Sequence, residues 1–520
     1  MTTVQLEVGA LRGRIEQGNH VFRGIPYAEP LTGLARWLPP QPRQPWQGVR
    51  DALEYGPACM QFSGGGFVFP FPQSRRRYFM ATGGGRPARD GDDSLLLNVW
   101  SPDVDRKARL PVMVWIHGGG FAQGAANAFY DGAPFASRGV VCIAIQYRLG
   151  AAGFLHGSGL FEGEVCADNR AFLDQIEALR WVQQHIEAFG GDPGNVTLFG
   201  ESAGAFAIYQ LAASPKAKGL FKRAIAMGGM AGTCAPAADY HRLSRDALAD
   251  VGVKAGDVQA LAALDRKQIQ TLQKAMARRV FKARPADQYG RLSREKVGFF
   301  GAATGTDFLP QAPLDAYPQG TPNDIDLMLG TCAHDGRLFS LMLPMLPSLS
   351  ARLFSKNFIE FVPGRDLPAA WDFYRQQMQG ASEREVLDQV NNDAFYRMPT
   401  LAAAEAHAGA HPGKTWHYQL DYVSVVKGLG AIHGIDVALL FGTCHGVLAD
   451  DAETAQLTEQ LRRAMISFAT SGRPAAKGLP EWTPFERASR PTLVFDRRSR
   501  LASDLDAPLR KFWQTEGSTP

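Results

Sequence analysis

The chain reads Val196-Thr197-Leu198-Phe199, then Gly200-Glu201-Ser202-Ala203-Gly204, then Ala205-Phe206-Ala207-Ile208-Tyr209. The apolar run predicts a buried strand and the last stretch predicts a helix, which places the serine on a sharp strand-to-helix turn. Glycines on both sides let strand and helix approach closely, so that the turn pushes the hydroxyl outward. With 55 glycines in the chain, a glycine-rich corner with a capping serine explains these residues about as well as a nucleophile does.

A second glycine-rich segment lies upstream. Val112-Met113-Val114-Trp115-Ile116 predicts a buried strand that leads directly into His117-Gly118-Gly119-Gly120-Phe121. Such a loop exposes backbone N–H groups, and donors fixed at a developing oxyanion contribute roughly 3 to 4 kcal/mol each in acyl-transfer enzymes. The N–H groups of Gly119, Gly120 and Ala203 are the predicted oxyanion hole. A flexible turn after a strand is the alternative.

A serine nucleophile needs a base, and the base needs a carboxylate, in the chain order serine, acid, histidine. Residues 325–330 predict a strand, and Asp335 follows its C-terminal end, where α/β sheets present catalytic side chains. Residues 415–420 alternate like another strand, and His433 lies in the loop beyond it. Asp335 is the predicted acid and His433 the predicted base.

The chain has eleven histidines, so the candidate base has to be chosen among them by its position in the sequence. His117 contributes its backbone to the glycine loop, and His417 lies within an expected strand. His334 and His445 remain rival bases. Asp436 is too near His433 in sequence to be the obvious orienting acid, and we assign it to a helix start.

Together these segments resemble the type-B carboxylesterase family, whose relatives include the cholinesterases and bacterial para-nitrobenzyl esterases. The resemblance runs through almost the whole chain and is carried by residues 22–28, 97–100, 173–182, 189–193 and the glutamate-serine-alanine core at 201–203. It implies the α/β-hydrolase fold. That fold has a large, mostly parallel central sheet flanked by helices, with helical and loop insertions that form a gorge or lid.

The resemblance also implies roles that match the choice made from the residues: nucleophile, acid, base and oxyanion donors at Ser202, Asp335, His433, Gly119, Gly120 and Ala203. For Glu201 two interpretations stay open, because it either supports the site by holding water or polarising it, or is required only by the turn.

The chain departs from the family pattern at three places. Asp335 stands where the family usually has glutamate, so its backbone must bring the shorter carboxylate closer. Ser94 stands where the family has a cysteine that pairs with the one Cys59 resembles, so that disulfide is not expected. Residues 227–229 replace a motif that often carries a serine near the triad, which removes one supporting hydrogen bond or moves it elsewhere.

Composition limits the remaining possibilities. The net charge is +4 over 520 residues, which gives no reason to expect nucleic acid as a partner. The six cysteines are widely spaced, and the start of the chain lacks a secretory pattern, so we expect a cytoplasmic protein. No apolar run approaches the roughly 20 residues that span a bilayer. We expect no metal or organic cofactor, a small-molecule ester as substrate, and a monomer or homodimer.

One site drawn from distant segments argues for a single domain over residues 1–520, with insertions at about 62–93 and 240–320. Residues 244–280 predict a helical excursion, and residues 457–470 predict an amphipathic helix. Arg75, Arg76 and Arg77 in the first insertion either attract anionic esters or form a solvated basic loop. Residues 338–346, apolar with two methionines, either line the acyl or alcohol pocket or belong to the core.

The sequence therefore predicts a serine carboxylesterase that works through an acyl-enzyme. Two alternatives stay open: a silent or narrow-specificity binding protein on the same fold, and a hydrolase of amides, carbamates or thioesters.

Overall fold

The computed structural model describes residues 1–61, 89–285, 287–295, 300–320, 323–342, 347–358, 366–443 and 446–514. Most of the first insertion, including Arg75–Arg77, and His445 lie outside these residues.

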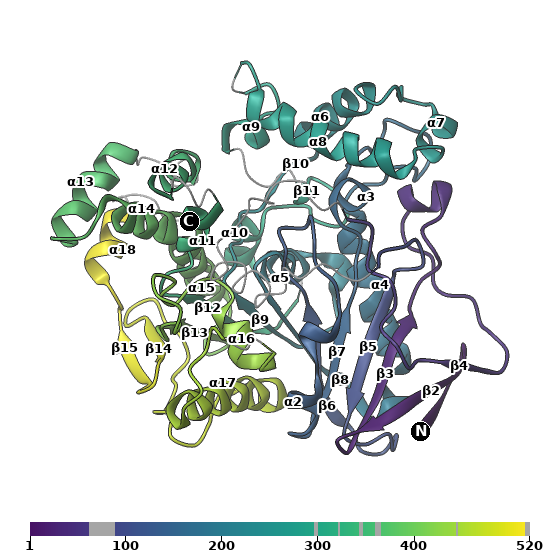
Figure 1. The fold of residues 1–520 in the computed structure, drawn as a ribbon, viewed down its shortest axis with the longest axis horizontal. Coiled ribbons are helices and arrows are strands. Elements are labelled where there is room, and N and C mark those ends of the chain that lie inside the picture. Colours follow the sequence, from purple (N-terminus) through teal and green to yellow (C-terminus); the bar gives the residue numbers. More distant parts are fainter. Residues whose placement is uncertain are drawn as a thin grey trace.

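A large twisted sheet runs through the molecule in the order β1-β2-β3-β5-β7-β6-β8-β9-β12-β13-β14-β15, with β4 paired to β2 (Figure 1). The strands from β7 to β14 in this order are parallel, which confirms the mostly parallel sheet. The pairs at both edges are antiparallel, apart from the parallel pair of β2 and β4. The strands are β1 (Thr2–Leu6), β2 (Gly9–Glu16), β3 (Asn19–Pro26), β4 (Val49–Asp51), β5 (Leu96–Ser101), β6 (Leu110–Ile116), β7 (Val141–Ile145), β8 (Gly191–Glu201), β9 (Arg223–Met227), β12 (Asp326–Cys332), β13 (Thr415–Leu420), β14 (Pro491–Phe495) and β15 (Arg500–Ser503), with a separate parallel pair β10 (Cys234–Pro236) and β11 (Ala302–Thr304).

Helices cover both faces of this sheet, with α4 and α5 in the core of one face and α16 and α17 in the core of the other. The helices of the described residues are α2 (Ala133–Ala136), α3 (Gly150–Phe154), α4 (Arg170–His185), α5 (Ala203–Ala213), α6 (Ala237–Ala249), α7 (Val258–Ala262), α8 (Arg266–Lys282), α9 (Arg291–Glu295), α10 (Pro313–Ala316), α11 (Arg337–Met342), α12 (Pro347–Phe358), α13 (Leu367–Gln377), α14 (Glu383–Asn391), α15 (Met398–Ala410), α16 (Ile435–Phe441), α17 (Ala452–Ser471) and α18 (Ala507–Trp513), and a π-helix (Asn392–Arg397) joins α14 to α15.

The apolar runs form strands because the sheet buries both of its faces. On β6, Val112, Val114 and Ile116 join the core that holds α4 and α5, whereas Met113 and Trp115 join the core that holds α16 and α17. Side chains alternate across a strand, so both layers of helices must be present for these residues to be buried.

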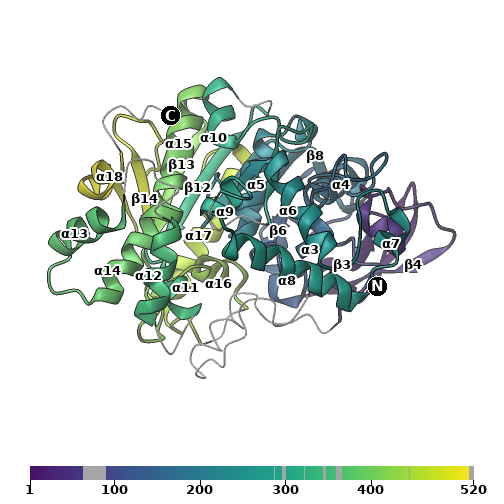
Figure 2. The ribbon, with the colours of Figure 1, turned by 90° about the horizontal axis from the view of Figure 1, so that it is seen from above.

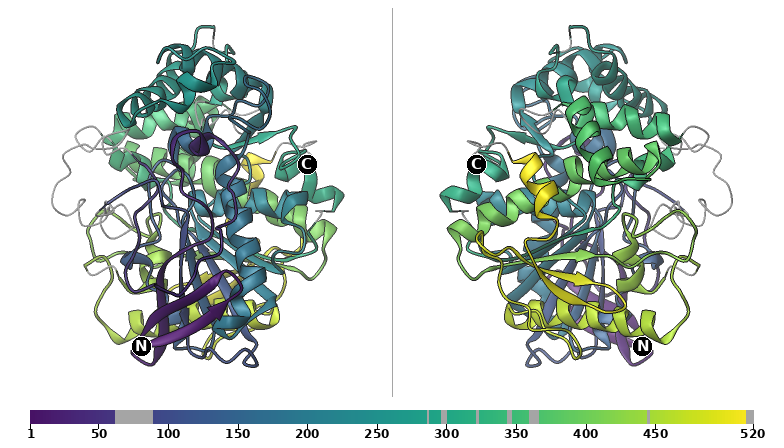
Figure 3. Two further views of the ribbon diagram at one scale, coloured as in Figure 1. Left: turned by 90° about the vertical axis from the view of Figure 1, so that its right-hand side faces the viewer. Right: turned by 90° about the vertical axis from the view of Figure 1, so that its left-hand side faces the viewer.

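The expected helical excursion is confirmed. It comprises α6, α7 and α8, and α8 begins with a capping box between Asp265 and Gln268. Figures 1 and 3 show α6 and α8 at one end of the molecule, away from the N-terminal strands β1 and β2. A second helical group, α11, α12 and α14, packs together (Figure 2).

The predicted C-terminal helix is also present and longer than expected. This helix is α17, which begins at Ala452 because the Asp451 side chain caps its first turn. It ends at Ser471, before Gly472 in the left-handed conformation. Within the described residues, none of the helices combines the length and the apolar character needed to cross a membrane.

Candidate active site

Ser202 lies at the carboxyl end of β8, directly before α5. Its φ is 56° and its ψ is −121°, a strained conformation for a residue with a side chain. The flanking glycines are required sterically: a Cβ at Gly200 would lie 2.8 Å from the Ile116 carbonyl oxygen, and one at Gly204 would lie 2.0 Å from the same atom. The Ser202 N–H donates to the Met227 carbonyl of β9 over 3.0 Å. This is the predicted strand-turn-helix corner, and the serine is only half-buried.

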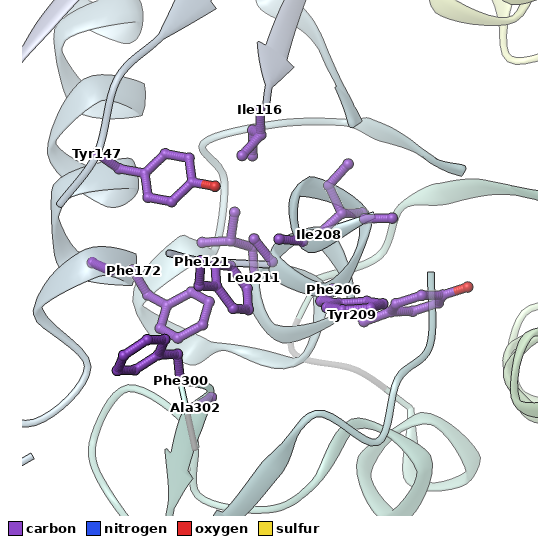
Figure 4. Close-up of a cluster of buried hydrophobic side chains, with 14 of the residues drawn as sticks. Ile116, Phe121, Tyr147, Phe172, Phe206, Ile208, Tyr209, Leu211, Phe300 and Ala302 are labelled. Atoms are coloured by element: carbon purple, nitrogen blue, oxygen red, sulfur yellow. The ribbon is translucent and has the colours of Figure 1, made fainter. Parts of the chain in front are cut away.

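One apolar core anchors both the corner and the glycine loop. Figure 4 shows Phe206, Ile208 and Leu211 of α5 near Ile116 at the end of β6 and Phe121 after the loop. The ring centroids of Phe121 and Phe206 are 6.2 Å apart. This core therefore fixes the position of the glycine loop relative to the serine corner.

The glycine loop lies against Ser202. A Cβ at Gly118 would be 3.1 Å from the Ser202 Cβ, and Gly119 and Gly120 have φ values of 111° and 62°. Among the described residues, no hydrogen bond uses the N–H of Gly119 or Gly120. Ala203 is the first residue of α5, and its N–H has no acceptor within the helix. Three backbone donors therefore remain available beside the serine.

Asp335 and His433 form a buried pair. The Asp335 Oδ1 lies 2.9 Å from the His433 Nδ1, and the Asp335 Oδ2 accepts the Cys332 N–H over 2.8 Å. Asp335 has no exposed surface and His433 is 5% exposed. The second hydrogen bond ties the shorter carboxylate to the end of its own strand, β12. An aspartate therefore reaches the imidazole here without the extra methylene of a glutamate.

Glu201 faces the other nitrogen of the same imidazole. Its Oε1 lies 3.0 Å from the His433 Nε2. Burial lowers the pKa of His433, but the charge of Glu201 and the hydrogen bonds with Asp335 and Glu201 outweigh this effect and hold that pKa well above its ordinary value. The imidazole of His433 therefore lies between two carboxylates, and Glu201 contacts it as well as completing the turn.

Asp436 is the third carboxyl group of this cluster. It lies in the first turn of α16, as expected, and its Oδ1 accepts the Val437 N–H over 2.9 Å. Burial and the charges of Glu201 and Asp335 raise the pKa of Asp436 to about 7. The raised pKa favours the protonated form of this carboxyl group beside His433.

The other histidines have structural contacts. The His117 Nδ1 lies 2.9 Å from the Gly118 carbonyl oxygen, and the His417 Nδ1 lies 3.0 Å from the Thr492 hydroxyl. His334 joins the acid loop to the histidine loop: its N–H donates to the Ala431 carbonyl and its Nδ1 accepts the Ala431 N–H, both over 3.0 Å. Neither hydrogen bond of His334 involves Ser202.

An aromatic wall adjoins the imidazole. The ring centroids of Tyr396 and His433 are 4.8 Å apart. The ring centroid of Phe339 lies 5.9 Å from that of Tyr396 and 5.4 Å from that of Phe395. Phe339 belongs to the apolar segment 338–346, whose residues 343–346 lie outside the described part of the chain. The sequence analysis did not identify Tyr396, because this residue lies on a π-helix, which the hydrophobic periodicity of the sequence does not predict.

No organic cofactor is implied by these residues. In the described part of the chain, no three His, Cys, Asp or Glu side chains are grouped so that they could hold a metal ion. The arrangement can supply a hydroxyl nucleophile, an imidazole base and backbone donors for an oxyanion.

Comparison with known proteins places these features in a family. Residues 1–513 match the model of the carboxylesterase family. The chain is 32% identical to the para-nitrobenzyl esterase of Bacillus subtilis over 98% of this chain and 97% of that protein, and 32% identical to the phenmedipham hydrolase of Pseudarthrobacter oxydans over 96% of each. The crystal structure of carboxylesterase EST55 of Geobacillus stearothermophilus is similar with a TM-score of 0.81 and 30% identity, over 99% of this chain and 100% of that one.

The sheet order, the strained serine corner and these matches agree over nearly the full length, and the chain therefore belongs to the carboxylesterase family.

Proposed function

We propose that Ser202, His433 and Asp335 carry out the reaction of this carboxylic ester hydrolase, with Gly119, Gly120 and Ala203 as oxyanion donors. The observation that carries the assignment is the buried Asp335–His433 pair at 2.9 Å. The pair contacts Glu201, the residue before the strained serine, whose Oε1 lies 3.0 Å from the His433 Nε2, and the glycine loop is packed against that serine.

The reaction begins when the neutral His433 Nε2 takes the proton of Ser202 as its Oγ attacks the ester carbonyl. Asp335 keeps the imidazole proton on Nδ1 and stabilises the imidazolium that forms. The three N–H groups hold the oxyanion, and the alcohol leaves with the proton from Nε2. Water then attacks the acyl-enzyme by the same steps in the second half.

Glu201 has a positioning role in this scheme. In the resting structure its carboxylate contacts Nε2, the nitrogen that must accept the serine proton. Glu201 stabilises the imidazolium through charge, and the imidazole must be neutral before the attack. The pH at which the enzyme becomes active therefore depends on Glu201.

Turnover of para-nitrophenyl esters from acetate to octanoate, with wild type and Ser202→Ala in parallel, tests the assignment. We expect hydrolysis by the wild type and a fall in kcat of about 10⁶-fold in the variant. The chain-length profile measures the length of acyl chain that the enzyme accepts. Full turnover by Ser202→Ala would overturn the assignment, and a folded wild type without turnover would favour a binding protein.

The proposal also covers the domain organisation, the oligomeric state and the location of the enzyme. The chain acts as a single domain and as a monomer or homodimer. The enzyme is cytoplasmic, which is supported by buried free thiols at Cys59, Cys142, Cys166, Cys234 and Cys332. Burial raises the pKa of the Cys59 thiol to about 12. Attraction of anionic esters by Arg75–Arg77 stays a prediction, tested by comparing the salt dependence of hydrolysis of charged and neutral esters.

A further inference from the structure

The side chain of Gln61 binds both backbone polar groups of Gly124. Its Nε2 donates to the Gly124 carbonyl over 2.9 Å, and its Oε1 accepts the Gly124 N–H over 3.2 Å. A primary amide can form this pair of hydrogen bonds because it carries a donor and an acceptor side by side. Gln61 is half-buried and lies directly before the first insertion. A side chain 63 residues away in the sequence therefore holds the backbone just after the glycine loop.

Gly124 in turn packs against the glycine loop. A Cβ at Gly124 would lie 2.4 Å from the His117 Nδ1 and 2.6 Å from the Gly118 carbonyl oxygen, and these two atoms are themselves hydrogen-bonded over 2.9 Å. The preceding residue, Gln123, donates its N–H to the Gly119 carbonyl over 3.2 Å. The backbone at 123–124 therefore contacts the carbonyl groups of both Gly118 and Gly119.

These two carbonyl groups set the direction of two predicted oxyanion donors. The Gly118 carbonyl shares a peptide group with the Gly119 N–H, and the Gly119 carbonyl shares one with the Gly120 N–H. Because a trans peptide is planar, its C=O and N–H bonds point in opposite directions, and fixing the carbonyl fixes the N–H. Gly119 and Gly120 have φ values of 111° and 62°, and glycine backbones move readily between conformations. Contacts with the carbonyl groups therefore keep both donors in place.

Gln61 is itself anchored by two charged residues. Its N–H donates to the Asp90 Oδ2 over 3.3 Å, and its carbonyl accepts the Arg266 Nη2 over 2.9 Å. Arg266 is the first residue of α8 and also binds the two Asp90 oxygens over 3.0 and 2.6 Å. The Gln61 Nε2 makes a further hydrogen bond of 3.2 Å with the Cys59 carbonyl. Backbone and side chain of Gln61 are both held, so the amide keeps one orientation toward Gly124.

We propose that Gln61 is a positioning residue of this esterase. Through Gly124 it holds the carbonyl groups of the glycine loop and so keeps the N–H groups of Gly119 and Gly120 aligned for the oxyanion. The inference rests on the proposed function, because it takes these N–H groups as the oxyanion donors. The oxyanion forms in the transition state and is absent from the bound ester, so loss of the Gln61 amide lowers kcat and leaves KM nearly unchanged.

Kinetics of Gln61→Leu in the full chain test the proposal, since leucine forms neither hydrogen bond with Gly124. We expect kcat on para-nitrophenyl acetate to fall about tenfold, with KM within about twofold of the wild type, because misaligned donors stabilise the oxyanion less.

The matched control is Gln183→Leu. Gln183 is also half-buried, and its Nε2 donates to the carbonyl groups of Pro193 and Leu220 over 2.9 and 3.0 Å. Pro193 lies at the start of β8, whereas Ser202 follows its end. This variant loses two hydrogen bonds to the backbone away from the glycine loop, and it should keep the kcat of the wild type.

Inhibition by hexyl trifluoromethyl ketone separates alignment of the donors from a general loss of structure. The Ser202 Oγ adds to the ketone carbon, its proton passes to the His433 Nε2, and the ketone oxygen becomes an oxyanion. We expect Gln61→Leu to raise the inhibition constant by the same factor by which it lowers kcat/KM. Gln183→Leu should leave the inhibition constant unchanged.

The proposal is overturned if folded Gln61→Leu keeps the wild-type kcat, if only KM changes, or if kcat/KM falls while the inhibition constant stays the same. It is also overturned if Gln183→Leu lowers kcat as much. A wild type that neither hydrolyses esters nor binds the ketone overturns the proposed function, and this proposal with it.

If Gln61→Leu fails to fold by circular dichroism, Gln61→Glu decides. Glutamate keeps the length of the side chain and lacks the donor to the Gly124 carbonyl. This variant should lower kcat by about three- to tenfold, because one of the two hydrogen bonds is lost. An unchanged kcat in folded Gln61→Glu overturns the proposal.

Discussion

The backbone of Gly228 packs directly against the imidazole of His433. A side-chain carbon at position 228 would lie 3.1 Å from both Nδ1 and Cε1 of the ring and 3.5 Å from the Asp335 Oδ1, and Gly228 has a φ of 56°. This glycine, in the segment that departs from the family motif, therefore limits the position of the Asp335–His433 pair by contact.

Gly228→Ala should lower kcat on para-nitrophenyl acetate by about 10- to 100-fold, because a displaced imidazole no longer meets the serine in line. Gly219→Ala is the control, since Gly219 has a φ of 80° with nothing within 4 Å of its Cβ. Both variants should lose about 1 kcal/mol of stability from the left-handed conformation. Equal kcat values for the two would show that contact with His433 does not matter.

Asp335→Asn should reduce kcat by up to about 10⁴-fold with little change in the unfolding temperature. The carboxylate accepts N–H groups from His433 and Cys332, and an amide offers only one oxygen to these two donors. Asp324→Asn, which removes an exposed carboxylate before β12, is the control and should leave kcat unchanged. A near-wild-type Asp335→Asn enzyme would mean that another carboxylate orients the base.

Activity should fall as the pH decreases through the pKa of His433, which lies above its ordinary value because two carboxylates favour the charged ring. The protonated ring cannot accept the serine proton, so the raised pKa moves the acidic limb of kcat/KM to higher pH. Glu201→Gln removes one of these charges and should shift the limb to lower pH. Glu187→Gln, at an exposed pair with Arg109, should not. An unmoved limb in Glu201→Gln would contradict the proposed role of Glu201.

Ser94→Cys should form a disulfide with Cys59 under mild oxidation, detected as a loss of two thiols in mass spectrometry. The Cys59 Sγ lies 3.6 Å from the Ser94 carbonyl oxygen, and the buried Ser94 hydroxyl has no hydrogen-bond partner. A bridge across this loop should stabilise the oxidised protein by on the order of 3 kcal/mol. Ser94→Ala is the control and should show no redox-dependent stability. Two persistent thiols in the oxidised cysteine variant would refute the prediction.

The parts of the fold that the sequence predicts are those with a local physical signal. Apolar runs identify β6 and β8 because both faces of the sheet are buried. The start of β8 is missed, since it begins at Gly191 and runs through Pro193, where pairing with Leu110 of β6 overrides poor strand propensity.

The residues of the candidate site likewise fall into two groups, those with a local sequence signal and those without one. Ser202 and the glycine loop are predictable because turns have compositional signatures, and the choice of Asp335 follows from its place after a strand. The contacts of Glu201 and Tyr396 with His433 join residues from opposite ends of the chain. Such contacts depend on side-chain rotamers and on a π-helix, and single-sequence patterns describe neither.

The candidate catalytic side chains emerge beyond the ends of β8, β12 and β13, which lie close together in the sheet order β8-β9-β12-β13. The hydrogen-bonded spacing of these strands sets the distances between Ser202, Asp335 and His433, whatever length of chain connects them. The helical excursion between β9 and β12 can therefore lengthen, shorten or change its composition during evolution while the reacting groups stay in place. New substrate preferences can arise in this enzyme by remodelling its connections, with the chemistry inherited unchanged.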